Sequence, residues 1–339
     1  MLFKEICLGL IQTNSMYRLG CCFLFVFFLG MGSLTHAQDG SRILEQLEEE
    51  LAGWADSMYN AMDPTERDGY NERFIRGLVQ ALKEPNSFQY PFEKLTEHIN
   101  ILYPDDRSFR IFNWALAPTP VTRRYYGAIQ KAGEELQLYP LIDYSNQMKE
   151  EIESMVLRDG KWFGVLYYRI LTNDWNGQKM YTLLGLNASS PISNIKVAEP
   201  MIFEETGPVF GAPVFNIRST ENPEQRIHRF HIEYKKEVSA SMNWDDEMKL
   251  IYFDLLESSV NDPHRKYTYV PTGQIDGLRW NRGVWNYVHD LIPIDPRTDG
   301  NAPAPIPIKE KLGENSGEFN YLRVLFSGPV AQLDRASAF

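Results

Sequence analysis

Carboxylates beside apolar, strand-like segments are the side chains of this sequence best suited to chemistry. Two of them about 5–10 Å apart are enough for glycoside hydrolysis. Asp254, inside the apolar run LIYFDLL, should have a perturbed pKa or a fixed partner, unless it simply bonds a backbone N–H at a strand end. Asp254 and Asp276 are the candidate catalytic residues of such a hydrolase. Two more carboxylates have apolar neighbours, Asp143 and Glu199, and the sequence does not pair any of the four in space.

Tryptophans offer a second kind of chemistry, because flat rings stack on the apolar faces of sugars. Six of the seven lie in the β-rich part of the chain: Trp114, Trp162, Trp175, Trp244, Trp280 and Trp285. Most of them have the parity of strand residues that face a core. Trp175 lies in a polar, turn-rich segment, so we expect it to be exposed. Trp175 and its neighbour Asp174 are therefore the candidate ligand contacts.

The histidines do not predict a metal site. The closest two are His228 and His231, in RIHRFHIEY. On a strand, a step of three residues places them on opposite faces, so they cannot both bind one metal ion. The chain has no HExxH motif, no phosphate-binding glycine loop and no GxSxG motif. We expect no metal, no cofactor and no nucleophilic catalysis.

Composition and charge exclude some classes of protein. The 339 residues are 43% hydrophobic and 23% charged, which is typical of a globular chain. The formal net charge of −11 disfavours binding to nucleic acid, which needs a basic surface. An aromatic content of 13% favours strands over helices.

The first 37 residues resemble a signal peptide. Arg18 precedes an apolar run from Cys21 to Met31, and the small residues around His36 suggest cleavage before Gln38. Met16 is the better start residue. An uncleaved anchor is the alternative, but the run is short for a membrane span of roughly 20 residues. All three cysteines precede the cleavage point, so the exported chain would have no cysteine. It would also have no transmembrane span, because the apolar run lies before the cleavage point too.

Residues 38–104 are expected to be helical. Apolar residues recur at steps of three and four from Leu44 to Met58. Asp63 and Pro64 begin a second helix as N-cap and first residue. A third, short helix is expected over Phe92 to Leu102.

Residues 105–290 are expected to form an antiparallel β domain. Successive strand-like segments are separated by turn residues, and no long helix crosses between them. Trp162 to Leu171 is apolar at both parities, so this strand should be covered on both faces. Closure as a propeller, a barrel or a sandwich remains open. Residues 291–327 are rich in Pro and Gly, which predicts an extended tail. Residues 328–339 can be back-translated into part of a tRNA gene, which indicates that the reading frame runs into a neighbouring tRNA gene (read-through).

Four motifs carry a resemblance to a known group of proteins. They are FRIFNWAL…YYGAIQ, YYRILTNDWNGQKMYTLLGLN, PVFGAPVF and YVPTGQIDGLRWNRGVWNYV. With these the chain resembles a family of exported, uncharacterised proteins of Bacteroidota over roughly Phe74 to Asp290. That family often has a segment like YTLLGWD. At the end of the corresponding segment this chain has Leu186-Asn187-Ala188, so the Trp-Asp pair is absent. The resemblance implies export and no catalytic residue.

We therefore expect an exported binding or scaffold module of the bacterial envelope, periplasmic or at the cell surface. A glycan or an envelope protein is the expected class of partner. The alternative is a glycoside hydrolase-like enzyme that uses Asp254 and Asp276.

Overall fold

The structure is a computed structural model that describes residues 41–148, 151–217 and 226–291. The signal-like segment, the read-through segment and all but the first residue of the expected tail lie outside the described residues. The described chain is mainly β with antiparallel sheets and an N-terminal helical segment, so the predicted fold class is confirmed. None of its helices is long and apolar enough to cross a membrane.

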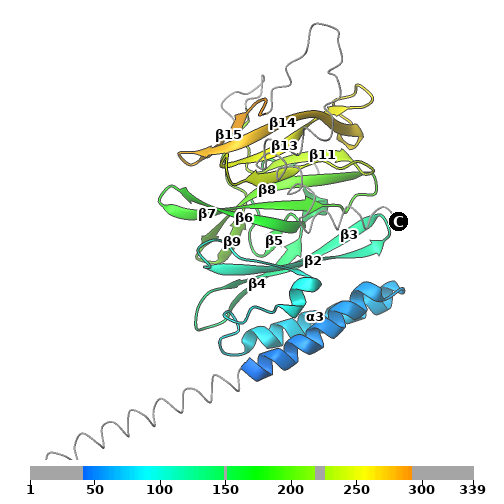
Figure 1. Ribbon diagram of the computed structural model, residues 1–339, viewed down its shortest axis with the longest axis vertical. Coiled ribbons are helices and arrows are strands. Elements are labelled where there is room, and N and C mark those ends of the chain that lie inside the picture. The colour runs from blue at the N-terminus through cyan, green and yellow to red at the C-terminus, as the bar shows by residue number, and fades with distance from the viewer. Residues whose placement is uncertain (1–40, 149–150, 218–225, 292–339) are drawn as a thin grey trace, which may run out of the picture. The chain divides into compact units, whose positions relative to one another are not determined.

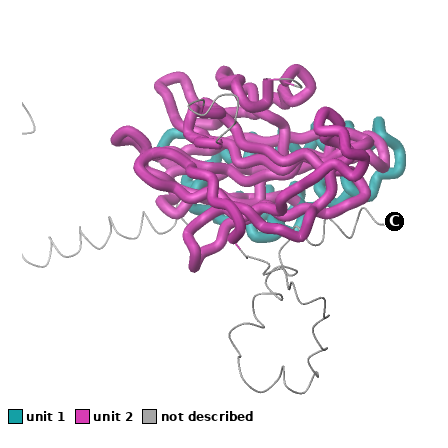
Figure 2. Tube along the Cα trace, turned by 90° about the horizontal axis from the view of Figure 1, so that it is seen from above, with its two compact units in different colours: residues 1–98, 134–136 teal, residues 99–133, 137–339 magenta. Residues whose placement is uncertain are grey.

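The chain divides into two compact units (Figure 2). Unit 1 is residues 1–98 with 134–136, and unit 2 is residues 99–133 with 137–339. The described part of unit 1 is mainly a helix over residues 41–60, followed by α3 (Pro64–Lys83). The carboxylate of Asp63 accepts the backbone N–H groups of the first turn of α3, as the sequence predicted.

The third predicted helix is wrong over most of its length. Only the 3₁₀ helix η1 (Lys94–Glu97) forms, and β1 (Asn100–Leu102) follows at once. The reason is tertiary, because β1 pairs antiparallel with a strand of unit 2. The β domain therefore begins before residue 105.

The described part of unit 2 contains three sheets of five strands (Figure 1). The first sheet has the order β1, β2 (Phe109–Thr119), β3 (Thr122–Lys131), β4 (Gln137–Asp143) and β5 (Lys161–Trp162). The middle sheet has the order β11 (Phe230–Lys235), β8 (Ser193–Glu204), β7 (Gln178–Asn187) and β6 (Leu166–Trp175), with β9 (Gly207–Phe210) on β8. The third sheet has the order β10 (Phe215–Asn216), β15 (Val284–Val288), β14 (Tyr269–Asn281), β13 (Leu250–Ser258) and β12 (Met242–Asp245). Two short 3₁₀ helices, η2 (Ser145–Gln147) and η3 (Lys266–Thr268), lie in the connections.

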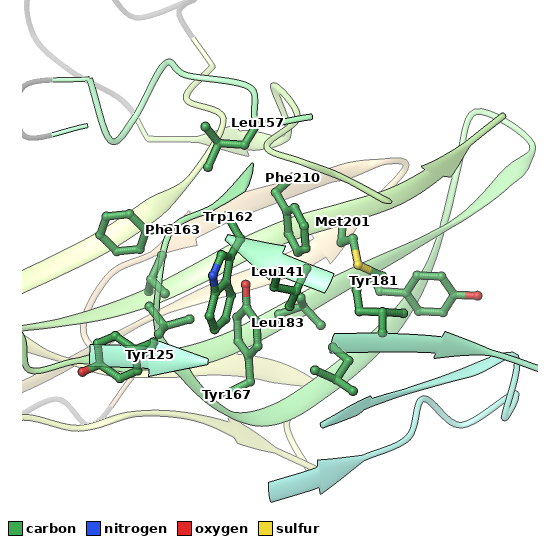
Figure 3. Packing of buried hydrophobic residues seen from close by; sticks show 14 of the residues in the cluster. Tyr125, Leu141, Leu157, Trp162, Phe163, Tyr167, Tyr181, Leu183, Met201 and Phe210 are labelled. Carbon is green, nitrogen blue, oxygen red and sulfur yellow. The ribbon is translucent and has the colours of Figure 1, made fainter. Parts of the chain in front are cut away.

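Two apolar cores hold these sheets together. The first core joins residues of the first and middle sheets, such as Ile111 and Leu183 (Figure 3). The second joins the middle and third sheets, such as Leu184 and Phe253. The middle sheet is therefore covered on both faces, as predicted from the double apolar parity of its first strand. Since two sheets pack on it face to face, the described residues form a layered stack and no closed barrel.

The hairpins follow from their turn residues. Asn176 and Gly177 both have positive φ, at 49° and 82°, which is the backbone of a type I′ turn between β6 and β7. Arg282 and Gly283, at 49° and 85°, form the same kind of turn between β14 and β15. The first of these turns lies in the turn-rich segment that the sequence indicated around Trp175.

Candidate functional site

A pocket of about 420 Å³ opens at the edge of the third sheet where β10 meets β15. Five of the described residues line it: Asn216, Ile217, Asn286, Tyr287 and His289. Asn216 and Asn286 are direct neighbours in the parallel register of β10 and β15. Asn216 Nδ2 donates a hydrogen bond to Asn286 Oδ1 at 3.1 Å. Because both amides lie on paired strands, the strand pairing fixes their positions.

A buried carboxylate lies behind this wall. Asp276, in β14, is only 2% exposed. Its Oδ2 accepts the hydroxyl of Tyr287 at 2.5 Å, and its Oδ1 accepts the backbone N–H of Asp290 at 3.0 Å. His289 Nδ1 is 3.6 Å from Oδ2. Asp276 therefore contacts two of the five wall residues without being a wall residue itself.

The chain after β15 reaches Asp276 because of a glycine. A Cβ on Gly277 would lie 2.9 Å from Leu291 Cδ1 and 3.0 Å from the carbonyl oxygen of Ile251. Without it, the backbone N–H of Leu291 bonds to the carbonyl of Ile275 at 2.9 Å. This close approach positions Asp290 to donate to the Asp276 carboxylate.

The phenol of Tyr287 is held in its protonated form. Burial raises its pKa most, and the hydrogen bond to the Asp276 carboxylate raises it further. The ring packs edge-on against Phe253 and lies 4.6 Å from the His289 ring, between centroids. Tyr287 is thus a fixed polar group with an apolar face.

The two catalytic candidates do not come together. In the register of β13 and β14, Asp276 is opposite Phe253, whose side chain is buried in the second core. Asp254 is the next residue along β13, so its side chain lies on the other face of the sheet. It accepts the backbone N–H of Ser241 at 2.7 Å, which is the structural alternative that the sequence left open. The geometry of a two-carboxylate hydrolase is not present in this pair.

The two candidate ligand contacts are also separated. Trp175 is the last residue of β6, paired with Gln178, and its ring packs against the second core. The expectation that Trp175 is exposed is wrong, because the turn is only the two residues after it and the side chain is half-buried. Asp174 is exposed and forms an ion pair with Lys179 at 2.9 Å. Neither residue lines the pocket.

The remaining carboxylates have structural partners. Glu199 accepts hydrogen bonds from Tyr167 Oη and from Arg229 Nε, and all three side chains are fully buried. Burial of a charge is tolerated when it is paired in this way. Asp143 accepts the backbone N–H of Ser145 at 2.9 Å.

Among the described residues, His228 and His231 are not part of any group of three metal-binding side chains. The carboxylate nearest to His231 is that of Glu153, at 3.6 Å from its Nδ1. In the part of the chain that the structure describes, no three metal-binding side chains gather.

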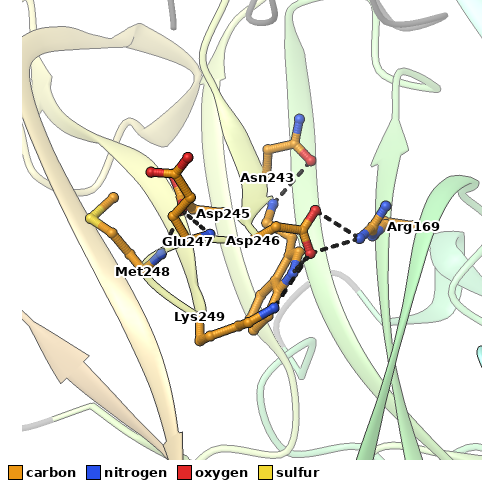
Figure 4. A network of polar contacts seen from close by, with 8 residues as sticks. Arg169, Asn243, Asp245, Asp246, Glu247, Met248 and Lys249 are labelled. Carbon is orange, nitrogen blue, oxygen red and sulfur yellow. Dashed lines mark hydrogen bonds and ion pairs between the residues drawn. The ribbon is translucent and has the colours of Figure 1, made fainter. Parts of the chain in front are cut away.

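An exposed polar network joins the middle and third sheets (Figure 4). Asp246, in the turn between β12 and β13, accepts the indole N–H of Trp244 at 2.8 Å. Arg169, in β6, approaches the same carboxylate at 3.4 Å. All the charged groups are exposed, so screening by water keeps the contribution of this network to stability small.

Comparison of the chain with protein-family models, with curated proteins and with solved structures gave no match. The site therefore rests on its own geometry. From the sequence, Asp276 was a candidate, but its neighbours were not. His289 stood out only as one histidine of several, and no spacing connected Asn216 to Asn286.

Proposed function

We propose that this chain is an exported, non-catalytic binding module of the bacterial envelope, and that it holds a small polar ligand in the pocket of the third sheet. The observation that carries the proposal is the wall of the pocket. Two asparagines, a tyrosine and a histidine line it together with the apolar side chain of Ile217, and the two asparagines are fixed by the pairing of β10 and β15. A concave site with a few fixed polar groups is typical of small-molecule binding.

Export is the second part of the proposal. It is supported by the signal-like segment and by the resemblance to exported proteins of Bacteroidota. A ligand of the envelope, such as a sugar or a fragment of a glycan, fits a pocket with amides and an aromatic ring. An interaction with nucleic acid is disfavoured by the net charge of −11.

A pocket-filling variant tests this function. The purified full chain is screened by thermal shift against monosaccharides, amino sugars and soluble envelope glycans. Ile217→Trp fills the pocket, so we expect it to lose the stabilisation that a ligand gives to the wild type, which is about 2.7 kcal/mol at a hundred times Kd.

Ile192→Trp is the matched control, because Ile192 is 53% exposed and does not line the pocket. It should respond to the ligand as the wild type does. The proposal fails if no compound shifts the wild type, or if a ligand stabilises Ile217→Trp equally.

A further inference from the structure

The hydrogen bonds around Asp276 decide which protons the pocket can offer to a ligand. Tyr287 has a single hydroxyl proton, and it donates this proton to Asp276 Oδ2. Its oxygen can therefore only accept a hydrogen bond from a ligand. Since burial and the Asp276 carboxylate both raise the pKa of Tyr287, the phenol keeps that proton.

The imidazole of His289 is also arranged to accept a hydrogen bond from a ligand. Its Nδ1 faces the Asp276 carboxylate at 3.6 Å, and its side chain is otherwise 80% exposed. In a neutral ring, the carboxylate favours the proton on Nδ1. Nε2 then has a lone pair and accepts hydrogen bonds.

The two amides lie on the other face of the sheet, because Asn286 directly precedes Tyr287 in β15. Asn216 Nδ2 donates to Asn286 Oδ1, and Asn286 Nδ2 donates to the carbonyl of Val284 at 3.3 Å. No described group donates to Asn216 Oδ1. Each amide nitrogen keeps one proton, which suits a hydroxyl on the ligand.

The negative charge of Asp276 also favours a cationic ligand. The five described residues of the wall include no lysine or arginine. The formal charge in contact with Tyr287 and His289 is the buried carboxylate of Asp276, while Asn286 pairs in register with Arg279 of β14. Ile217 and the Tyr287 ring supply an apolar surface beside the acceptors.

We infer that the pocket recognises a primary ammonium group on a small ring or short chain, such as that of an amino sugar. An ammonium group has donors and no acceptor, which complements Tyr287 Oη and His289 Nε2, whose residues lie two apart in sequence and share one face of the sheet. This inference rests on the proposed binding function and names the chemistry of its ligand.

Three small probes, each built on a cyclohexane ring, distinguish recognition of a cationic, a neutral and an anionic group. Cyclohexylammonium, cyclohexanol and cyclohexanecarboxylate are each titrated into the full chain at neutral pH, and binding is measured by calorimetry. We expect cyclohexylammonium to bind at least about tenfold more tightly than cyclohexanol, which is the effect of one charge-assisted hydrogen bond. The carboxylate should bind least.

Two variants test the role of the proton arrangement. In Asp276→Asn, the amide oxygen can still accept from the Asp290 N–H, but the amide nitrogen donates to Tyr287 Oη. The phenol proton then turns toward the pocket, and the affinity for cyclohexylammonium should fall at least about tenfold while that for the carboxylate does not fall. Tyr287→Phe keeps the ring, removes the acceptor, and should also weaken ammonium binding if Asp276→Asn proves too unstable to measure.

The outcomes separate this inference from the function on which it rests. Tighter binding of cyclohexanol or of cyclohexanecarboxylate to the wild type overturns the inference, but if Ile217→Trp abolishes that binding, the pocket is still a binding site. Unchanged ammonium affinity in both variants also overturns it. If none of the three probes binds, the inference fails, and the wider screen with Ile217→Trp decides the proposed function by itself.

Discussion

At the scale of single residues, the pocket depends on a carboxylate that no ligand would touch. Asp276 is buried, and it acts by fixing Tyr287 and by facing His289. A carboxylate inside an apolar strand is visible in a sequence, so Asp276 could be predicted. Its partners could not, because they carry no motif and meet only when β14 and β15 pair. The same limit explains why Asp254 and Asp276 looked equivalent until the register of β13 and β14 placed them on opposite faces.

His231 predicts a residue-scale dependence of stability on pH. Burial, followed by the positive charges of Arg229 and Lys266, lowers its pKa to about 4. In an unfolded chain a histidine has a pKa of about 6.5, so between about pH 6.5 and pH 4 the unfolded state binds a proton that the folded state does not. The free energy of unfolding should therefore fall with decreasing pH across this range, by up to about 3 kcal/mol.

Denaturant titrations at pH 7 and at pH 4.5 measure this effect. His231→Gln should lose a smaller part of its stability between the two pH values than the wild type does. Burial raises the pKa of the neighbouring Glu153, which gives the opposite dependence, so Glu153→Gln serves as the control. Equal losses in His231→Gln and in the wild type would contradict the assignment to His231.

At the scale of elements, neighbouring residues predicted the start of α3 and the turn after β6, whereas strand pairing determined which other segments became strands. The N-cap of α3 and the Asn176-Gly177 turn need only neighbouring residues, and both were readable. The segment after η1 has a helical pattern, yet Asn100 to Leu102 form a strand because β2 offers backbone partners. Tertiary pairing of this kind overrides a short helical pattern.

Two glycines of α3 give a matched prediction for that helix. Nothing lies within 4 Å of a Cβ built on Gly69, whereas a Cβ on Gly77 would lie 2.4 Å from the ring of Trp54. Gly69→Ala should therefore stabilise the protein by about 0.5–1 kcal/mol, through helix propensity. Gly77→Ala should destabilise it by about 1–3 kcal/mol, because the tryptophan must move. Equal shifts of the thermal midpoint in the two variants would show that the helices do not pack as described.

At the scale of the whole of unit 2, the middle sheet serves both cores. Alternate residues of β6 and β7 belong to different cores, such as Ile170 to the first and Leu171 to the second. The two apolar parities of β6 predicted a strand with both faces covered. They did not predict that β11, far along the chain, would join this sheet beside β8, since such an order depends on the packing of the complete unit.

One buried hydrogen bond connects the middle and third sheets. The indole N–H of Trp285, in β15, donates to Thr182 Oγ1, in β7, at 3.0 Å. Thr182→Val leaves that N–H without an acceptor, so the free energy of unfolding should fall by about 1–3 kcal/mol. Denaturant titration followed by tryptophan fluorescence measures the change.

Thr172→Val is the matched control in the neighbouring strand. The buried hydroxyl of Thr172 has no hydrogen-bond partner among the described residues. Its replacement by a methyl group of similar size should leave stability unchanged or raise it slightly. A larger loss in Thr172→Val than in Thr182→Val would contradict the contact between the two sheets.

We propose that the pocket beside Asn216 and Asn286 is a binding site. Its most direct test is a calorimetric titration of the best compound from the screen into the wild type, Ile217→Trp and Ile192→Trp. The proposed function predicts saturable binding to the wild type and to Ile192→Trp, and none to Ile217→Trp. Equal affinity in all three proteins would show that the ligand binds elsewhere and would contradict the assignment of function to this pocket.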